Sequence, residues 1–447
     1  MTHDMTKGSI LSLLVRFTLP LVAGNILQLT YNAVDSIILG RFVGSHQLAA
    51  VGTSNPLMTL ILMCMQGISL GCGVLIGQLF GNGDMKKLQR QVSTGMMFGV
   101  VFALAVSVMI NIGAASLLHL IQVNELILPH AIIYLRIVGC GLIFSFLYNY
   151  LSSVLRSLGD SVTPLFFLAL SSVLNIAGDL LFVIVLHMGI AGCAISTVLC
   201  EGLSCGLAFL YIIKKIPFLN MGRKWLVFDR GMIKKTLQYS SVTAIQQSTV
   251  QAGILGVQAV VNTMGAAATA GFAVANRIDD YSLIPGRHIA NAMTNVLAQN
   301  VGAGKKERVR KTFIIGMALE ITFGIIASVL LFLVYDVCLK LFTEEAIVLE
   351  EGRTYLRLIA WMYVLPAVTN GIQGFFRGTG RLKITLISSI LNMGMRFISC
   401  MILVFIFHMG IEAVPWSCFI GWTSMLVLEV PLLLQEQKKL MSKFTQE

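Results

Sequence analysis

Twelve long apolar runs divide this chain of 447 residues. Each run is near the roughly 20 residues that a helix needs to cross the hydrocarbon core of a membrane. Only 12% of the residues are charged and 56% are hydrophobic, whereas roughly 25% are charged in soluble proteins. We therefore predict an all-α polytopic membrane protein with twelve transmembrane helices, over about 13–39, 48–79, 92–118, 130–155, 162–186, 189–213, 236–262, 267–299, 312–335, 353–376, 383–407 and 410–434.

The chain also contains an internal duplication, in which the first half aligns with the second at an offset of 221. At this offset residues 156–159 (RSLG) align with 377–380 (RGTG), and residues 187–190 (HMGI) align with 408–411 (HMGI). Six spans in each half give both halves the same orientation, so we expect two six-helix bundles related by a pseudo-two-fold axis along the membrane normal. Paired bundles of this kind are typical of proteins that hold a site between their halves and expose it on either side in turn.

A basic stretch between the sixth and seventh runs marks the boundary between the halves. It contains Pro217 and Gly222 and is rich in lysine and arginine. We predict an N-terminal six-helix lobe over residues 1–215, a basic cytoplasmic linker over 216–235 and a C-terminal six-helix lobe over 236–447.

The net charge of +11 is unevenly distributed along the chain. The loops between spans 2–3, 4–5, 6–7, 8–9 and 10–11, together with both termini, hold 23 of the 32 lysines and arginines. The positive-inside rule places these loops and both termini in the cytoplasm. We expect a multi-pass protein of the plasma or inner membrane that contacts lipid. The basic loops are too short to form the folded basic face that a nucleic-acid partner needs, so no such partner is expected.

Signatures of catalysis and nucleotide binding are missing from the sequence. There is no H-E-x-x-H, Walker A or G-x-G-x-x-G pattern, which argues against an enzyme and against ATP-driven transport. Residues 67–71 fit G-x-S-x-G, but they lie inside an apolar run and not at the strand–turn–helix elbow that this pattern needs. The nine cysteines include no C-x-x-C pair and are interpreted as packing residues. No catalytic residue and no cofactor are expected.

Polar side chains inside the spans are the candidates for function, because an ionisable residue at the membrane centre costs about 2.5–3.5 kcal/mol on insertion scales. The first span carries Asn25, Gln28, Asn32 and Asp35 within about 80° of one another on a helix. A polar seam between helices would also explain this stripe. We favour a cavity, because Asp35 has no basic partner in its own span.

The fifth span carries Asn175 and Asp179 one helical turn apart, on one face. Carboxylates with amide and hydroxyl oxygens suit a small cation, and two close carboxylates can also share a proton. When residues 171–175 are aligned with 388–392, at an offset of 217, Arg396 takes the position of Asp179. We therefore predict that this chemistry is confined to the N-terminal half.

Other ionisable groups within the spans are less specific. Arg277 and Asp280 are three residues apart in span 8 and form a secondary polar site, for which an intrahelical ion pair is favoured over a direct role in coupling. Glu201 and Glu320 are isolated acids that could titrate or lie near a membrane edge.

The chain resembles the multidrug and toxic compound extrusion family, MATE, over essentially its whole length. The resemblance rests on the two six-span lobes, on Pro20 followed by Asp35 within residues 34–41 (VDSIILGR), and on the paired loops 81–83 (GNG) and 302–304 (GAG). The spacing of the acid and amide in span 5 is similar to that of the DinF-like branch.

That resemblance implies a cation site in the N-terminal lobe. Carried across, its residues are Asp35, Asn175, Asp179 and Thr197, the last by span alignment alone. If sodium is the coupling ion, Asp35, Asn175 and Asp179 are the expected metal ligands. The other main branch relies on acids in spans 7 and 10, where this chain offers only amides.

These observations lead to a functional expectation. We expect a monomeric secondary active multidrug efflux antiporter that exports small organic compounds, cationic amphiphiles as the family implies, in exchange for Na+ or H+ by alternating access. Gln28, Asn32, Asn149 and Met58 are expected to line the substrate cavity. One alternative is a flippase for a lipid-linked precursor, or an exporter of an endogenous metabolite, of the same superfamily. The other is a non-transport membrane scaffold or sensor, which would need a folded extramembrane domain that no loop here is long enough to form.

Overall fold

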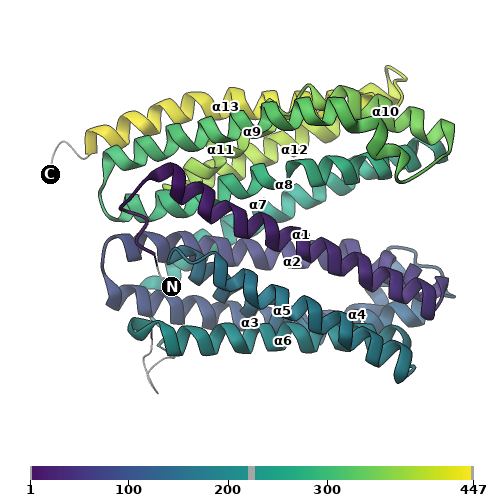
Figure 1. Cartoon of the computed structure of the whole chain (residues 1–447), viewed down its shortest axis with the longest axis horizontal. Helices are drawn as coiled ribbons and strands as arrows, with labels where there is room; N and C mark the ends of the chain where they lie inside the picture. Colours follow the sequence, from purple (N-terminus) through teal and green to yellow (C-terminus); the bar gives the residue numbers. More distant parts are fainter. Residues whose placement is uncertain (1–2, 220–226, 444–447) are drawn as a thin grey trace. The chain divides into compact units, whose positions relative to one another are not determined.

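The structure, a computed structural model, describes residues 3–219 and 227–443, and these contain helices and no strands (Figure 1). The helices cover the twelve expected spans and confirm the all-α class. They are α1 Ile10–Phe42, α2 Ser45–Gly81, α3 Met85–Leu120, α4 Leu128–Ser157, α5 Val162–Asp179, α6 Gly189–Lys215, α7 Arg230–Asn262, α8 Ala266–Gly302, α9 Lys306–Lys340, α10 Ala346–Ala360, α11 Val364–Gly378, α12 Leu382–Phe405 and α13 Ala413–Lys443. A π-helical segment, Leu180–Val185, continues α5, and a short 3-10 turn, Pro217–Leu219, follows α6.

The tenth expected span is two helices, which corrects the prediction of one continuous helix over 353–376. The first helix, α10, ends at Ala360, and α11 begins at Val364. Pro366 lies in the first turn of α11. Its ring would clash with the carbonyl of Met362 in a continuous helix, and it has no N–H to donate. Hydropathy merged the two helices because the residues between them are apolar.

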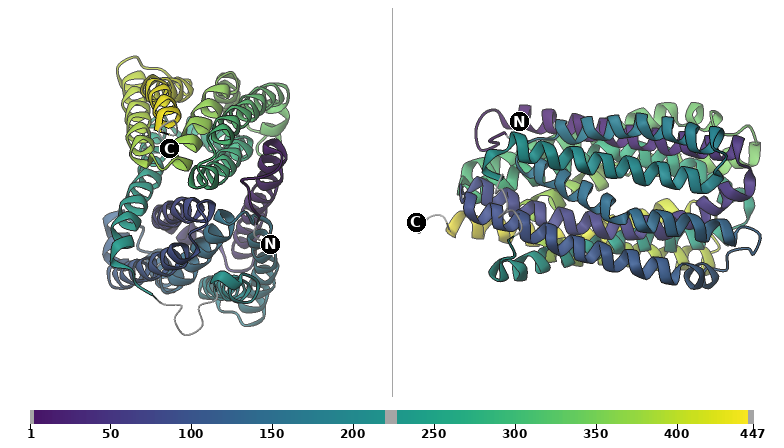
Figure 2. Two further views of the ribbon diagram at one scale, coloured as in Figure 1. Left: turned by 90° about the vertical axis from the view of Figure 1, so that its left-hand side faces the viewer. Right: turned by 90° about the horizontal axis from the view of Figure 1, so that it is seen from below.

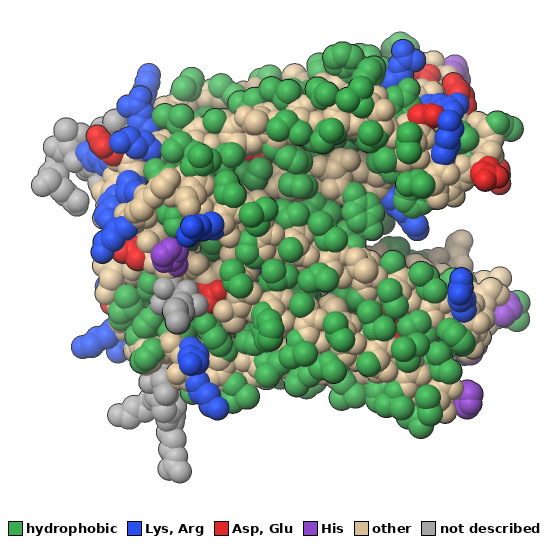
Figure 3. Space-filling view, viewed as in Figure 1, with side chains coloured by type: hydrophobic (Ala, Val, Ile, Leu, Met, Phe, Trp, Pro, Cys, Tyr) green, Lys and Arg blue, Asp and Glu red, His purple; other side chains and the backbone are tan. Residues whose placement is uncertain are grey.

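Nine helices in the described part of the chain are long and apolar enough to cross a membrane. Of the remaining four, α10 and α11 have 15 residues each, and α7 and α8 are long enough but carry more polar side chains. Hydrophobic side chains cover the length of the helices, and lysines and arginines gather near the helix ends (Figure 3). This is the surface of a multi-pass membrane protein.

The chain forms two compact units. Unit 1 comprises Met1–Asp4 and Leu19–Ala244, and unit 2 comprises Met5–Thr18 and Ile245–Glu447. The boundaries therefore fall inside α1 and α7, whereas the predicted lobes met at the linker, of which residues 220–226 lie outside the described residues. The first helix of each half begins in one unit and ends in the other; Figure 2 shows the helices end-on and from a second side.

Close contact between α2 and α7 explains why the first turns of α7 belong to unit 1. A Cβ added to Gly67 would lie 2.5 Å from Cα of Ala244, and one added to Gly71 would lie 2.6 Å from the carbonyl oxygen of Tyr239. The Thr243 hydroxyl donates to the carbonyl oxygen of Gly67 at 2.5 Å. Helix backbones approach this closely only where the side chains are small. The glycines of the G-x-S-x-G pattern thus serve helix packing.

Residues 5–8, which precede α1, are held in unit 2 by two basic side chains. Arg308 donates to three backbone carbonyl oxygens of this segment at 2.9 to 3.3 Å. The Nζ atom of Lys305 donates to the carbonyl and hydroxyl oxygens of Thr6 at 2.9 and 3.0 Å. The charge-assisted bonds anchor the chain before α1 begins.

Replacing Arg308 with alanine is expected to release this segment. Two of the three Arg308 bonds are exposed and contribute little, whereas a hydrogen bond from a charged group to the part-buried Met5 carbonyl contributes about 1.5–3 kcal/mol. Local opening of residues 5–18 should therefore become at least about tenfold more frequent. Hydrogen–deuterium exchange of peptides from this segment measures the change, with Arg310→Ala, an exposed position on the same helix, as the control. Equal exchange in both variants would contradict the assignment.

The duplication is visible in the backbone. Left-handed conformations recur in equivalent positions of the two halves, at Gly44 and Gly265, Gly83 and Gly304, Gly159 and Gly380, and His187 and His408. The two histidines have φ angles of 52° and 53°, a conformation that costs a residue with a Cβ roughly 1–2 kcal/mol. Both halves retain this cost at the same position, so both build the same turn before α6 and α13.

Candidate functional site

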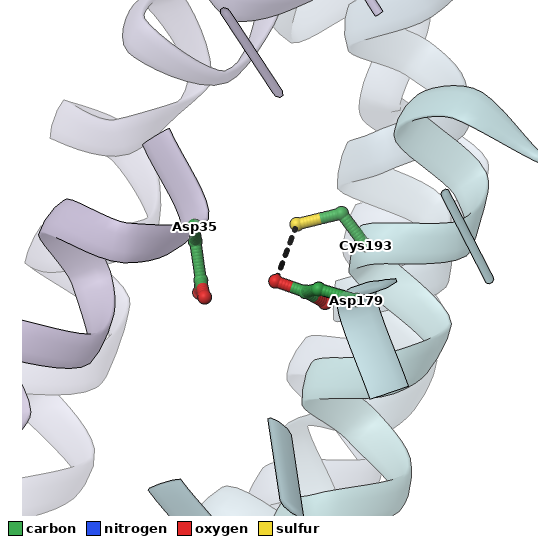
Figure 4. A group of neighbouring side chains, drawn as sticks. All are labelled: Asp35, Asp179 and Cys193. Atoms are coloured by element: carbon green, nitrogen blue, oxygen red, sulfur yellow. Dashed lines mark hydrogen bonds between the residues drawn. The ribbon is translucent and has the colours of Figure 1, made fainter. Parts of the chain in front are cut away.

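Three helices of unit 1 bring two acids and a thiol together. Asp35 lies on α1, Asp179 is the last residue of α5, and Cys193 lies on α6. One ligand atom of each lies within 4.8 Å of the others, and the side chains face a common space (Figure 4). Within the described residues, this is the one group of three His, Cys, Asp or Glu side chains close enough to hold a metal ion.

The backbone around Asp179 is irregular. The α-helix gives way to the π-helical segment Leu180–Val185 directly after this residue. Single π-turns are frequent at functional sites, where they change the direction of side chains. Asp179 is fully buried, and its Oδ2 accepts a weak hydrogen bond from the Cys193 thiol at 3.8 Å. The acid is therefore held inside the bundle and not at its surface.

Asn175 lies one turn before Asp179 and is oriented by α6. Its amide nitrogen donates to the hydroxyl oxygens of Ser196 at 3.3 Å and Thr197 at 3.4 Å. The Ser196 hydroxyl in turn donates to the backbone carbonyl of Asn175 at 3.0 Å. Because both nitrogen contacts go to α6, the amide oxygen is left available to another group.

Three buried oxygens of this cluster have no hydrogen-bond partner: Oδ1 of Asp35, Oδ1 of Asn175 and Oδ1 of Asp179. Buried polar atoms in proteins are almost always paired, and two ionised carboxylates at this distance repel each other. No lysine or arginine forms a salt bridge with either acid within the described residues. Oxygens of this kind are the ligands that small hard cations prefer, and a shared proton would also satisfy the two acids. The cluster thus fits the uptake of one small cation.

The structure places all four residues predicted for the cation site in this cluster, because Thr197 contacts Asn175 and the two acids meet. Sequence reasoning missed Cys193 and Ser196. Cys193 lies one turn before Thr197 on the same face of α6, and that spacing was a usable signal. Cysteines within spans are usually packing residues, which is why this signal is weak.

The residues predicted to line a substrate cavity have different surroundings. Gln28 and Asn32 are exposed on α1. Asn149 is half-buried, and its amide donates to the carbonyl of Ser145, one turn earlier, at 2.8 Å. Met58 is only 5% exposed and packs in the apolar core of unit 1. Met58 is therefore corrected to a core residue, because the side of α2 that carries it faces other helices.

The predicted pairing of Arg277 with Asp280 is also corrected. Asp280 pairs instead with Arg287, at 3.2 Å, and both side chains are exposed. Arg287 lies seven residues later, which returns to nearly the same face of the helix after two turns. The buried acid of α8 is Asp279, which accepts a hydrogen bond from the Tyr363 hydroxyl at 2.6 Å.

The equivalent region of unit 2 shows that the halves align without a gap. One contact recurs at an offset of 221: the Ser171 hydroxyl donates to the carbonyl oxygen of Cys200 at 3.0 Å, and a Cβ added to Gly421 would lie 2.6 Å from Oδ1 of Asn392. Arg396 is thus the counterpart of Asn175, and Cys400 is the counterpart of Asp179, which corrects the alignment at 217. The serine and asparagine repeat in the sequence was misleading because similar residues recur one helical turn apart.

Comparison with known proteins gives consistent results. The MatE family pattern matches residues 20–181 and 243–402. The chain is 29% identical over 399 residues to the "Probable multidrug resistance protein YpnP" of Bacillus subtilis, covering 87% of each chain. It is 25% identical to the "Probable multidrug resistance protein NorM" of Thermotoga maritima, covering 82% of this chain and 80% of that one. It is 22% identical to an "FAD transporter" of Shewanella oneidensis, covering 88% of each.

Solved structures show the same fold. One described as the "outward-facing conformation of a multidrug resistance MATE family transporter of the MOP superfamily" matches with a TM-score of 0.91 at 20% identity, over 98% of both chains. Another, "MATE in the bent conformation", matches with a TM-score of 0.92 at 20% identity, over 99% of this chain and 98% of that one. At this identity the likeness establishes the architecture and not the substrate.

Proposed function

Since the chain belongs to the MatE family of membrane transporters, we propose that it is a secondary active antiporter that exports small organic compounds in exchange for Na+ or H+. The observation that carries this proposal is the cluster of Asp35, Asn175 and Asp179, in which three buried oxygens have no partner. In this proposal the protein uses the cation site of the DinF-like branch, and transport involves no enzymatic step.

The proposed mechanism begins with the repulsion between Asp35 and Asp179. A cation that enters the cluster neutralises this repulsion and holds the side chain of α1 against those of α5 and α6. Coupling requires that the cation bind one conformation more tightly than the other. A preference of about 100-fold corresponds to about 2.7 kcal/mol, within the usual range for coupled sites. Because α1 begins in unit 2 and carries Asp35 in unit 1, fixing Asp35 constrains a helix shared by both units.

The proposed substrates are organic cations with an apolar body. Two of the relatives bear names that refer to multidrug resistance, and Gln28 and Asn32 offer exposed amides on the helix that carries Asp35. The name of another relative refers to FAD, which is anionic. An anionic substrate is therefore the outcome that transport assays should be designed to detect.

We propose that the protein lies in the plasma or inner membrane as a monomer with both termini in the cytoplasm. The basic loops on one side of the spans support this orientation. This orientation can be checked with single introduced cysteines, one near residue 7 and one in the loop near residue 344. Each cysteine is labelled in intact cells and in lysed cells.

Transport by the purified protein in vesicles tests the function. A sodium gradient and a pH gradient are imposed separately, and uptake of a fluorescent organic cation is followed, with FAD as a second probe. We expect one of the two gradients to drive the organic cation against its own gradient. Uptake that is independent of both gradients would contradict antiport, and uptake of FAD alone would overturn the proposed substrate class.

A further inference from the structure

Unit 2 contains another group of buried ionisable side chains, none of which belongs to the candidate cation site. Glu320 on α9 and Glu429 on α13 have no exposed surface. Arg377 on α11 interacts electrostatically with both. Both acids lie near the middle of helices that are long and apolar enough to cross a membrane, where an ionised group is expensive unless its charge is compensated.

Glu429 is hydrogen-bonded through one of its two carboxylate oxygens. It accepts a hydrogen bond from the amide of Gln373. That amide also donates to Ser388 at 2.8 Å, and its oxygen accepts from Gln246 at 2.9 Å. Neutral donors fixed by such a network stabilise a negative charge. Glu429 therefore has one hydrogen-bonded oxygen, Oε1, which makes it better suited than Glu320 to carry a charge, and only its Oε2 has no partner.

Glu320 has the opposite surroundings. Neither of its oxygens has a hydrogen-bond partner. Two glycines leave room for it: a Cβ on Gly286 would lie 3.3 Å from its Oε2, and a Cβ on Gly371 would lie 3.6 Å from its Cγ. The first of these glycines directly follows Pro285, which interrupts the hydrogen bonding of α8. A carboxylate buried without partners is strongly disfavoured relative to its neutral form.

The charges in this group do not balance when both acids are ionised. One arginine faces two carboxylates, which leaves one net negative charge inside the bundle. The helices packed against α9 and α13 are α8, α10, α11 and α12, and Arg377 is the one charged group on their described residues that interacts with both acids. Elsewhere on these helices, Glu436 already pairs with Arg381 at 2.8 Å, and His288 of α8 has interactions of its own.

The first half of the chain shows that the fold does not require these acids. At the offset of 221, Arg377 corresponds to Arg156, but Glu320 corresponds to Gly99 and Glu429 to Ala208. In unit 1 the space beside Gly99 is filled by Phe146, whose ring would overlap an added Cβ. The same packing is thus achieved without a carboxylate, so the acids serve a purpose in unit 2 other than its architecture.

We propose that Glu320 is a second proton-binding site, whose charge is influenced by Arg377 and Glu429 in the same buried group. Its carboxylate takes up one proton from water to become a neutral acid, and it releases that proton again when the site opens. The ligand is a proton and not a metal ion, because a single carboxylate beside a guanidinium offers too few oxygens and too much positive charge for Na+. The site does not depend on Asp35 or Asp179.

Infrared difference spectra of the full-length protein in detergent, recorded between alkaline and acidic buffer, test the proposal. A protonated carboxyl group has a carbonyl stretching band that a carboxylate lacks. We expect the wild type to show such a band from Glu320, and E320Q to lose it. The D35N/D179N double variant should retain it, which separates this site from the proposed coupling site. E436Q serves as the control on α13.

A second variant, E429Q, tests whether protonation of Glu320 depends on the neighbouring acid. In E429Q, Glu320 becomes the one carboxylate beside Arg377, and the pair is neutral without a proton. We therefore expect E429Q to lose the Glu320 band although Glu320 is still present, and to take up one proton fewer per chain in a dye titration. The proposal is overturned if the band survives in E320Q, if E429Q leaves it unchanged, or if it disappears in D35N/D179N.

Discussion

Replacing Asp179 with asparagine is expected to reduce cation-driven export by about 100-fold, the size of a typical coupling free energy of about 2.7 kcal/mol. The substitution keeps the shape of the side chain and removes one of the two charges that meet in unit 1. In the cation-free state of this variant, the two side chains no longer repel each other. Binding of the cation therefore relieves no repulsion and is only weakly favourable. Both states then have similar affinities for it, and no conformation is favoured.

Vesicle transport with imposed sodium or pH gradients measures this effect. Asp280→Asn is the matched control, because Asp280 is an exposed acid on α8 that pairs with Arg287. Substrate binding to purified Asp179→Asn, followed by fluorescence, should be retained, which distinguishes a loss of coupling from a loss of folding. Full gradient-driven export by both Asp179→Asn and Asp35→Asn would remove the basis of the proposed mechanism.

Replacing Gly67 with alanine is expected to destabilise unit 1 by about 1–3 kcal/mol, the usual cost of overpacking. The new methyl group would lie 2.5 Å from Cα of Ala244 and 2.6 Å from the carbonyl oxygen of Thr243. Both are backbone atoms, so no side chain can rotate away, and α2 and α7 must separate. The hydrogen bond from Thr243 to the Gly67 carbonyl would be lengthened as well.

Thermal unfolding in detergent measures this loss. Gly52→Ala is the control on the same helix, because a Cβ at Gly52 has no atom within 4 Å, and alanine is the better helix former by roughly 0.5–1 kcal/mol. The two substitutions are chemically identical and should shift the melting temperature in opposite directions. Equal melting temperatures would show that α2 and α7 are not in contact at Gly67.

Much of the candidate site could be predicted because its residues lie along single helices. Asn175 and Asp179 are four residues apart, and helical geometry alone places them on one face. The assignment of Asp35 and Thr197 to the same site came from the family resemblance, since nothing in the sequence shows which faces of α1, α5 and α6 meet. Cys193 and Ser196 were missed for the same reason.

Packing in the folded protein explains where the predictions from sequence fail. Arg277 and Arg287 both lie on the face of α8 that carries Asp280, and only the folded helix shows that Arg287 is the partner. Met58 is expected from the sequence to line the substrate cavity, although the helices around α2 bury it. Glu320 was an isolated acid in the sequence because its neighbours, Arg377 and Glu429, come from α11 and α13, which are distant from α9 along the chain.

Hydropathy and periodicity can be read directly from the amino-acid sequence. They predict the apolar segments apart from the break within the tenth, the internal repeat and the polar face of each helix, because these properties are local in the chain or follow from comparing one half with the other. The folded chain is needed to see which helix faces meet, at which residues α1 and α7 change from one unit to the other, and which buried charges have a partner. Those features depend on contacts between helices distant in the sequence, and on small residues such as Gly67 and Gly71 that set how closely two backbones can pack.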